Sequence, residues 1–394
     1  MTTQEMKNEM HECLTNNILH FWLERMIDRE RGGFYGRIDG NDHIVADAEK
    51  GAILNARILW AFAAAYRALG DHRYLDAALR AKEYILNHFV DKEYGGVYWS
   101  LNADGTPKDT KKQSYAIGFT IYGMSELARA TGDKEALDCA LSLYNSIEEH
   151  AFDAKNNGYI EALTRDWQPI ADMRLSDKDE NGSRTMNTHL HIIEPYTNLY
   201  RVAPSPELKE RLVNLLHIFT DRLLNKQTNH LDLFFNDEWQ GRRNIQSFGH
   251  DIEASWLLHE TALVLADKDV LQWIEPVVKN VAVAADEGLL DDGSMIYERW
   301  TDTGKTDRSL QWWVQCENII GHVNLWQHFG KEACLSIAAR CWNYTKTRLV
   351  DQKNGEWYWS INEDGSVNHS DDKAGFWKCP YHNTRMCLEI MERM

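Results

Sequence analysis

Side chains that are ionisable or can donate hydrogen bonds recur inside apolar helical segments of this 394-residue sequence. They are Arg57, Tyr115, His191, His250, Trp313, Glu317 and His382, in the segments LNARILW, QSYAIGF, MNTHLHIIEPY, SFGHDIEASW, QWWVQCENIIGH and WKCPYHNTRM. A single histidine on an apolar face is usually a hydrogen-bonded core residue. Three histidines and an arginine in equivalent segments instead predict one shared site.

Histidine suits a reaction that moves a proton on and off carbon, because its ordinary pKa lies close to neutral pH. The C–H beside a sugar aldehyde is weakly acidic, and its removal leaves an enediolate that needs a cation or hydrogen-bond donors at its oxygen. Arg57 fits that need, and two histidines on opposite faces of the carbon can remove and return the proton. Most of the 15 Trp and 16 Tyr are expected in the core, but some can stack on the flat face of a sugar.

Glycoside hydrolysis and metal chemistry are the alternatives. Hydrolysis requires a pair of carboxylic acids. The candidates are Asp179, Glu253 and Glu317. His189 and His191 are two residues apart, so they point to nearly opposite sides of a helix, and no H-E-x-x-H or C-x-x-C motif accompanies them. We therefore expect no metal and, because no glycine-rich phosphate loop follows a strand, no nucleotide cofactor.

A hairpin-like phrase occurs twice, 260 residues apart. DKEYGGVYWSLNADG (91–105) and DQKNGEWYWSINEDG (351–365) are identical at eight of fifteen positions, and their Asp, Gly-Gly and Asp-Gly are typical of turns. Weaker copies occupy 28–40, 153–161, 229–237 and 291–304. This period of roughly 60–75 residues indicates a repeat architecture of six units, which argues against two domains.

Helical periodicity fills the sequence between the hairpins. The predicted pairs are 51–70 and 71–89, 113–131 and 133–150, 185–203 and 206–224, 249–267 and 269–285, and 309–329 and 331–349, with single helices at 5–26 and 374–393. An open solenoid would need polar capping repeats, but both terminal helices are amphipathic. We therefore predict an all-α (α/α)6 barrel of twelve helices in two layers, with short β-hairpins in its loops and residues 1–394 as one catalytic domain.

Net charge and composition exclude several classes of binding partner. The formal net charge of −17 argues against nucleic acid and anionic membranes. No stretch approaches the roughly 20 apolar residues that cross a bilayer, and the polar N-terminus does not resemble a signal peptide. The seven scattered cysteines are expected to be reduced thiols. We expect a cytoplasmic monomer whose partner is a small-molecule sugar.

The motifs LNAR, MNTHLHIIEPYTNLY, SFGHDIEASWLL, WWVQCE and WKCPYHNTRMCLE together resemble the N-acylglucosamine 2-epimerase superfamily, and most closely its cellobiose 2-epimerases. The resemblance covers essentially the whole chain. It implies an (α/α)6 barrel that reversibly inverts C2 of the reducing-end glucose of β-1,4-linked disaccharides such as cellobiose, lactose or mannobiose. It also implies that no metal or nucleotide takes part.

The resemblance also implies roles for individual residues. His250 and His382 resemble the two acid/base residues, Arg57 and His191 those that hold the enediolate, and Glu253 the partner that tunes His250. Asn187, Asp179 and Tyr115 match residues that hydrogen-bond the sugar, and Trp313 and Trp377 match stacking residues. The order in which the two histidines act stays open.

Related activities on the same scaffold are the runner-up interpretations. An enediolate reprotonated at C2 gives an epimer, whereas reprotonation at C1 gives a ketose. A monosaccharide epimerase, acting on mannose or N-acylglucosamine, or an aldose–ketose isomerase therefore ranks second. A glycoside hydrolase ranks third. A sugar-binding protein without activity ranks last, because binding needs aromatic residues but not the histidines.

Overall fold

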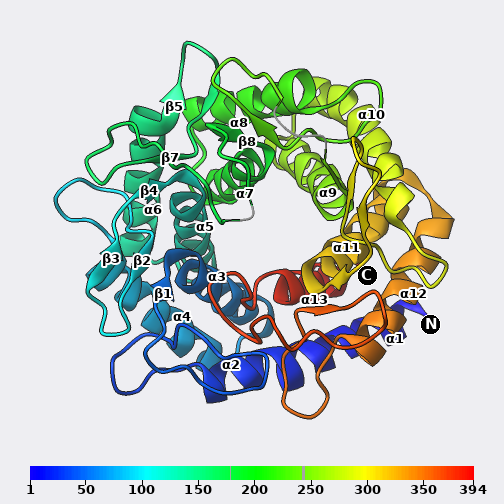
Figure 1. The fold of residues 1–394 in the computed structure, drawn as a ribbon, viewed down its shortest axis with the longest axis horizontal. Helices are drawn as coiled ribbons and strands as arrows, with labels where there is room; N and C mark the ends of the chain where they lie inside the picture. The colour runs from blue at the N-terminus through cyan, green and yellow to red at the C-terminus, as the bar shows by residue number, and fades with distance from the viewer. Residues whose placement is uncertain (178, 242–244) are drawn as a thin grey trace.

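The structure, a computed structural model, describes residues 1–177, 179–241 and 245–394, whose helices form two concentric rings (Figure 1). The inner ring consists of α3 (Ala52–Leu69), α5 (Ser114–Thr131), α7 (Met186–Val202), α9 (Phe248–Leu265), α11 (Trp312–Phe329) and α13 (His382–Arg393). Each inner helix packs on the next, and α13 packs on α3, so the ring is closed. The predicted (α/α)6 barrel is confirmed.

The outer ring covers the inner one. It consists of α1 (Thr3–Glu12) continuing through η1 (Cys13–Leu19) into α2 (His20–Arg25), α4 (His72–Tyr84), α6 (Lys134–Ser146), α8 (Pro206–Ile218), α10 (Lys268–Ala285) and α12 (Glu332–Arg348). The ends of four of these helices are extended by η2 (Ile85–Phe89), η3 (Ile147–Ala151), η4 (Phe219–Leu223) and η5 (Asp286–Gly288). Apolar pattern decides the layer: every residue of α3 from Ala52 to Ala65 is buried, whereas α10 buries Val270, Ile274 and Val278 at helical spacing.

The repeated phrase forms a bridged turn after each outer helix of the described chain, and the turn at Leu289–Met295 is one residue shorter than the others. The ends of these turns are bridged at Ile27–Phe34, Val90–Val97, Phe152–Tyr159, Leu224–Leu231, Leu289–Met295 and Val350–Trp357. The fourth copy begins at Asn225 rather than at 229 as predicted. Asn225 Oδ1 accepts from the backbone N–H of Gln227, just as Asp91 Oδ1 accepts from that of Glu93. An amide in place of the usual carboxylate concealed this copy.

Short ladders join each unit to the next at one end of the barrel. The paired strands are β1 (Lys50–Gly51) with β2 (Ser100–Leu101), β4 (Lys112–Gln113) with β7 (Ala162–Leu163), β8 (Arg184–Thr185) with β9 (Phe234–Phe235), β10 (Ile245–Ser247) with β11 (Glu298–Trp300), and β13 (Leu310–Gln311) with β14 (Ser360–Ile361). The remaining strands are β3 (Pro107–Asp109), β5 (Phe152–Asp153), β6 (Gly158–Tyr159) and β12 (Thr306–Asp307). A bridge between Ile38 and Ala374 closes the series, because it joins the first hairpin to the last inter-unit segment.

The last helix is shorter than predicted. The sequence pattern suggested 374–393, but α13 begins at His382. Pro380 disfavours a helical conformation for the residue before it, and Ala374 is engaged in the bridge to Ile38. Trp377 therefore lies on a loop and not on a helix.

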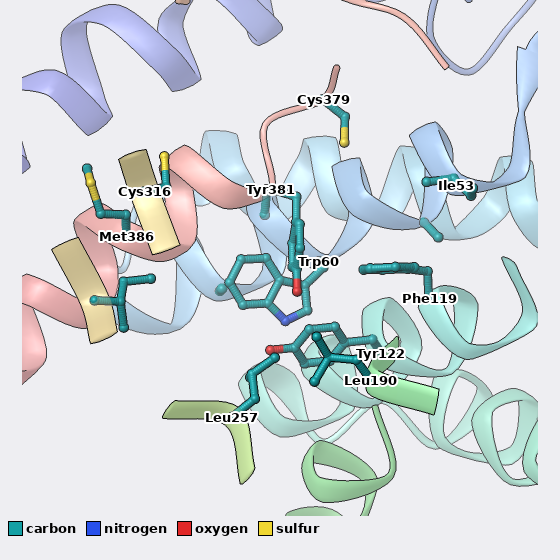
Figure 2. Close-up of a cluster of buried hydrophobic side chains, with 14 of the residues drawn as sticks. Ile53, Trp60, Phe119, Tyr122, Leu190, Leu257, Cys316, Cys379, Tyr381 and Met386 are labelled. Carbon is teal, nitrogen blue, oxygen red and sulfur yellow. The ribbon is translucent and has the colours of Figure 1, made fainter. Parts of the chain in front are cut away.

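Aromatic side chains fill the interior of the inner ring (Figure 2). The ring centroids of Trp60 and Tyr381 lie 5.3 Å apart, those of Trp60 and Tyr122 lie 5.2 Å apart, and Phe119 is 5.2 Å from Tyr381. This packed cluster closes the barrel below the end that carries the hairpins. In the described ranges, no helix is both long enough and apolar enough to cross a membrane.

Candidate active site

A cavity of about 1160 Å³ opens where the inner helices begin. Glu317, singled out from the sequence, does not line it, but the ten residues to which the resemblance assigned roles all do: Arg57, Tyr115, Asp179, Asn187, His191, His250, Glu253, Trp313, Trp377 and His382. The structure therefore brings together side chains from six inner helices and two loops. Their individual roles remain predictions.

The second turn of the inner helices supplies a layer of side chains beneath this cavity. Arg57, His191, Glu253 and Glu317 are each the sixth residue of their helix, in α3, α7, α9 and α11. The equivalent residue of α5 is Phe119, whose ring lies 4.1 Å from Arg57 Cζ. The repeat thus places chemically different side chains at one depth of the barrel.

A kink in α7 positions His191. Its backbone departs from helical geometry, with φ −91° and ψ 16°. Pro195 lies four residues later and has no N–H to donate to the His191 carbonyl, so that bond of the helix is lost. The carbonyl instead faces Gly118 of α5, where a Cβ atom would lie only 2.4 Å from it. Gly118 and Pro195 together allow the bend that directs His191 into the cavity.

Arg57 is buried, and its guanidinium is held by few hydrogen bonds. Nη2 donates to the Tyr115 hydroxyl at 2.8 Å, and Nη1 lies 3.5 Å from the Trp377 carbonyl. Nε has no hydrogen-bond partner among the described residues. A buried cation with an unused N–H at a cavity wall can stabilise a developing oxyanion.

The Trp313 ring lies close to both His250 and His382. The ring centroid of Trp313 is 4.7 Å from that of His250 and 5.7 Å from that of His382. Burial lowers the pKa of His250 to about 3, and burial together with the charges of Arg57 and Arg385 lowers the pKa of His382 well below its ordinary value. Both rings are therefore neutral near pH 7 and can act as bases.

His250 has a different partner from the one expected, and His382 has a carboxylate partner. His250 Nδ1 bonds the Ser247 hydroxyl at 2.8 Å, whereas His382 Nδ1 bonds Glu317 Oε1 at 2.6 Å. Glu253 was expected to tune His250, but it contacts Arg385 Nη2 at 2.6 Å and lies 3.9 Å from His382 Nδ1. The residue at the i+3 spacing thus turns toward the arginine at the barrel centre, where a buried carboxylate gains a counter-charge.

Pattern reasoning missed Arg385, Glu194, Tyr381 and Ser247. Arg385 contacts Glu194, Glu253 and Glu317, and Glu194 Oε2 lies 3.0 Å from His191 Nδ1. The signal was present: Glu194 follows His191 at i+3, and Arg385 follows His382 at i+3. Both pairs share one face of a helix.

One group of buried side chains has the composition of a metal site. Donor atoms of Glu253, Glu317 and His382 lie within 4.8 Å of one another. Arg385 Nη2 lies 2.6 Å from an oxygen of each glutamate, so a guanidinium already occupies the place of a cation between them. The donor set fits an arginine better than a metal ion.

Several buried polar atoms at the cavity form no hydrogen bond within the described chain. In the described chain, no hydrogen bond reaches Asn187 Oδ1, Glu253 Oε2 or Trp312 Nε1, and all three residues line the cavity. Buried polar atoms are normally hydrogen-bonded. Hydroxyl groups of a sugar can satisfy donors and acceptors alike.

Aromatic rings and one loop carboxylate complete the wall. Trp377 lies 6.1 Å from Tyr115 in an edge-to-face arrangement. Asp179 stands on the loop before β8, where its Oδ2 accepts from the backbone N–H and the hydroxyl of Ser176, both at 2.9 Å. These residues present flat faces and acceptors to the same space.

His189 is a core histidine, and it contrasts with His191. Its Nδ1 donates to the Thr185 carbonyl at 2.7 Å, and its Nε2 accepts from the Tyr159 N–H at 3.0 Å. Both nitrogens are thus satisfied inside the fold. Two residues of sequence separate a structural histidine from a cavity histidine.

Comparison with known proteins identifies the class. Residues 33–385 match the family model for N-acylglucosamine 2-epimerase (GlcNAc 2-epimerase). The chain belongs to this family of carbohydrate epimerases.

Individual members of the family match the chain over nearly its whole length. The chain is 58% identical to a cellobiose 2-epimerase of Bacteroides fragilis, over 98% of each chain. It is 38% identical to the cellobiose 2-epimerase of Ruminococcus albus, over 98% of this chain and 99% of that one. Among solved structures, cellobiose 2-epimerase from Bacillus thermoamylovorans superimposes with a TM-score of 0.94 at 40% identity, covering 99% of this chain and all of the other.

Proposed function

We propose that this protein reversibly epimerises C2 of the reducing-end sugar of β-1,4-linked disaccharides, converting cellobiose to glucosyl-mannose and accepting lactose or mannobiose as well. The observation that carries the proposal is the pair of neutral histidines, His250 and His382, beside a buried arginine with an unused N–H. The names of the most similar relatives support the disaccharide.

The geometry supports the following course of reaction. After the sugar ring opens, one histidine removes the C2 proton and becomes charged, and the electron pair moves onto the aldehyde oxygen to give an enediolate. Arg57 stabilises that oxygen. Rotation about C2–C3 then presents the opposite face to the second histidine, which takes up a proton from solvent and delivers it to C2. The first histidine then releases its proton to solvent, so both rings are neutral again and no metal, nucleotide or other co-reactant is consumed.

The Glu253–Glu317 pair is not available to a substrate for hydrolysis. Glu317 accepts from Trp256 Nε1 at 3.0 Å, from His382 and from Arg385, and it does not line the cavity. Only one member of the Glu253–Glu317 pair can therefore reach a sugar, whereas both roles of a glycosidase need a carboxyl group at the scissile bond.

Reaction in D₂O tests the proposal directly. Cellobiose, lactose and free mannose are incubated separately with the protein, and the products are analysed by NMR and mass spectrometry. Deuterium at C2 of a new disaccharide epimer is the expected result. Glucose released from cellobiose would indicate hydrolysis, a ketose would indicate isomerisation, and turnover of mannose alone would move the substrate to monosaccharides. Inhibition by EDTA would contradict catalysis without a metal.

A further inference from the structure

The deepest polar cluster under the cavity joins one arginine to three carboxylates. Arg385 Nη2 donates to Glu253 Oε1 and to Glu317 Oε1, both at 2.6 Å, while Nη1 donates to Glu194. Four inner helices (α7, α9, α11 and α13) meet at this guanidinium. All four side chains are at most 2% exposed, so water screens their charges little.

Two of these carboxylates each form a hydrogen bond with a histidine that lines the cavity. Glu194 Oε2 lies 3.0 Å from His191 Nδ1, and Glu317 Oε1 lies 2.6 Å from His382 Nδ1. A carboxylate accepts hydrogen bonds only, so each Nδ1 must carry the proton. The lone pair then resides on Nε2, which is the nitrogen a base would use.

We propose that Arg385 is a positioning residue that keeps Glu194 and Glu317 as anions and thereby fixes the Nδ1–H tautomer of His191 and His382. It acts through the carboxylates and does not touch the reacting atoms. The proposal rests on the proposed function, because it gives Arg385 a part in the same proton transfer.

The balance of charge supports this division of labour. Three buried carboxylates share one guanidinium, and a buried charge without a partner is strongly unfavourable. Burial acts to raise the pKa of Glu194, but Arg385 outweighs it, and that pKa is lowered to about 2. Burial also raises the pKa of Glu317, but burial together with the charge of Glu317 raises the pKa of Glu253 well above its ordinary value. Glu253 is therefore the member that takes up a proton.

Two aromatic rings hold the guanidinium in place. Arg385 Cζ lies 4.4 Å from the ring centroid of Tyr381 and 4.8 Å from that of Trp256. Figure 2 shows Tyr381 standing in the packed aromatic cluster with Trp60 and Tyr122. Such packing restricts rotation of the fork, so its N–H groups stay directed at the carboxylates.

The same helix supplies a matched control. Arg393 lies eight residues further along α13, pairs with Glu389 at 2.6 Å, and lies 5.7 Å from the ring of the same Trp256. It belongs to the opposite end of the barrel and does not line the cavity. Arg393→Met therefore perturbs a similar buried pair without touching the site histidines.

The first test needs no activity. NMR of the full-length protein with ¹⁵N-labelled histidine reports the tautomer of each ring at pH 7. The wild type and Arg393→Met are expected to show neutral Nδ1–H tautomers for His191 and His382, and Arg385→Met is expected to lose them. An Nε2–H tautomer or a charged ring in the wild type would overturn the proposal, even if the Met variant fails to fold. Because no substrate is present, this outcome is independent of the proposed disaccharide activity.

The second test is the pH dependence of kcat/KM. Titratable and charged groups around His382 are Glu317, Glu253, Glu194, Arg57, Arg385 and His191. Removing the Arg385 cation makes protonation of His382 easier, so the acid limb of Arg385→Met should move up by about one pH unit or more. Arg385→Lys keeps the charge but loses the fork, so it should lower kcat roughly tenfold with the limb in place. An unmoved limb in Arg385→Met, or an equal shift in Arg393→Met, would show a merely structural role.

Discussion

The two ends of the barrel treat buried polar side chains in opposite ways. Where the inner helices end, Arg67 of α3 pairs with Glu126 of α5 at 2.7 Å, and Arg201 of α7 pairs with Glu260 of α9. Where they begin, Arg57 Nε, Asn187 Oδ1 and Glu253 Oε2 have no hydrogen-bond partner in the described ranges. One end satisfies its charges within the fold, and the other leaves atoms for a ligand.

This contrast separates stability from function along one set of helices. Pairs between neighbouring helices at the closed end hold the ring together, and their loss should be seen in the free energy of unfolding. Polar atoms at the open end contribute little to the free energy of folding, because they lose their hydration on burial and form no hydrogen bond that offsets this loss. Substitutions at the two ends should therefore affect different measurements.

The largest effect is expected from removing either acid/base histidine. His250→Ala and His382→Ala should each lower kcat by about 10²–10⁴-fold, the usual contribution of general acid–base catalysis. Circular dichroism and thermal unfolding should show a folded protein. His189→Gln is the matched control, because His189 is satisfied inside the fold and should leave most of the activity. More than a few per cent of activity in either alanine variant would contradict a two-base reaction.

The next largest loss of activity is expected from Arg57→Lys. Its guanidinium reaches Tyr115 and keeps Nε free, a geometry that an ammonium group cannot reproduce. We expect kcat to fall about 10²-fold, similar to removal of one oxyanion donor, with a smaller change in KM. Wild-type kcat in this variant would exclude Arg57 from stabilising the enediolate.

The contrast between the ends could be predicted only in part from the sequence. Periodicity and the repeated turn phrase predicted the closed barrel, because turn chemistry and helical spacing are local properties. The same local evidence misplaced the start of α13, since the role of Ala374 depends on Ile38 at the far end of the chain.

The site shows the same limit. Residue types in apolar helices predicted the members of the cavity, because a buried polar group stands out in a sequence. Their partners could not be predicted, since Arg385 joins Glu194 across 191 residues of sequence. A three-residue spacing placed Glu253 near His250, but the charge at the barrel centre decided which way it turned.

A backbone substitution sharpens the comparison further. Gly118 and Gly123 both belong to α5. Gly118→Ala places a Cβ atom 2.4 Å from the His191 carbonyl oxygen of α7, and Gly123→Ala places one 2.7 Å from the Ala56 carbonyl oxygen of α3. Both should lower the free energy of unfolding by about 1–3 kcal/mol, as overpacking does. Only Gly118→Ala shifts His191, so it alone should also lower kcat, by roughly tenfold. Equal loss of kcat in the two variants would remove the kink from the account of the site.

Acid should lower the free energy of unfolding through His250, at the open end of the barrel. His250 is neutral in the folded protein, where its pKa is about 3, but its unfolded value is 6.5, so the unfolded chain binds more protons between these pH values. The free energy of unfolding should therefore fall as pH drops below 6.5 toward 3. Urea unfolding between pH 4.5 and 7.5 measures this slope, which His250→Ala should make shallower. An unchanged slope in the variant would show that His250 is not held neutral by burial.

The smallest effect on activity is expected at the closed end. Arg201 and Glu260 join α7 to α9, and their side chains are 25% and 18% exposed, so the pair is partly shielded from water. Arg201→Met keeps the apolar stem of the side chain but removes the charge, and should lower the free energy of unfolding by about 1–2 kcal/mol. Because α7 also carries His191, this variant is a strict test of the separation between the two ends. Steady-state kinetics should give kcat/KM within about twofold of wild type, the range of a change that leaves transition-state contacts intact. A large loss of kcat/KM in a folded Arg201→Met would mean that the closed end also sets the geometry of the cavity, and that the two ends are coupled through α7.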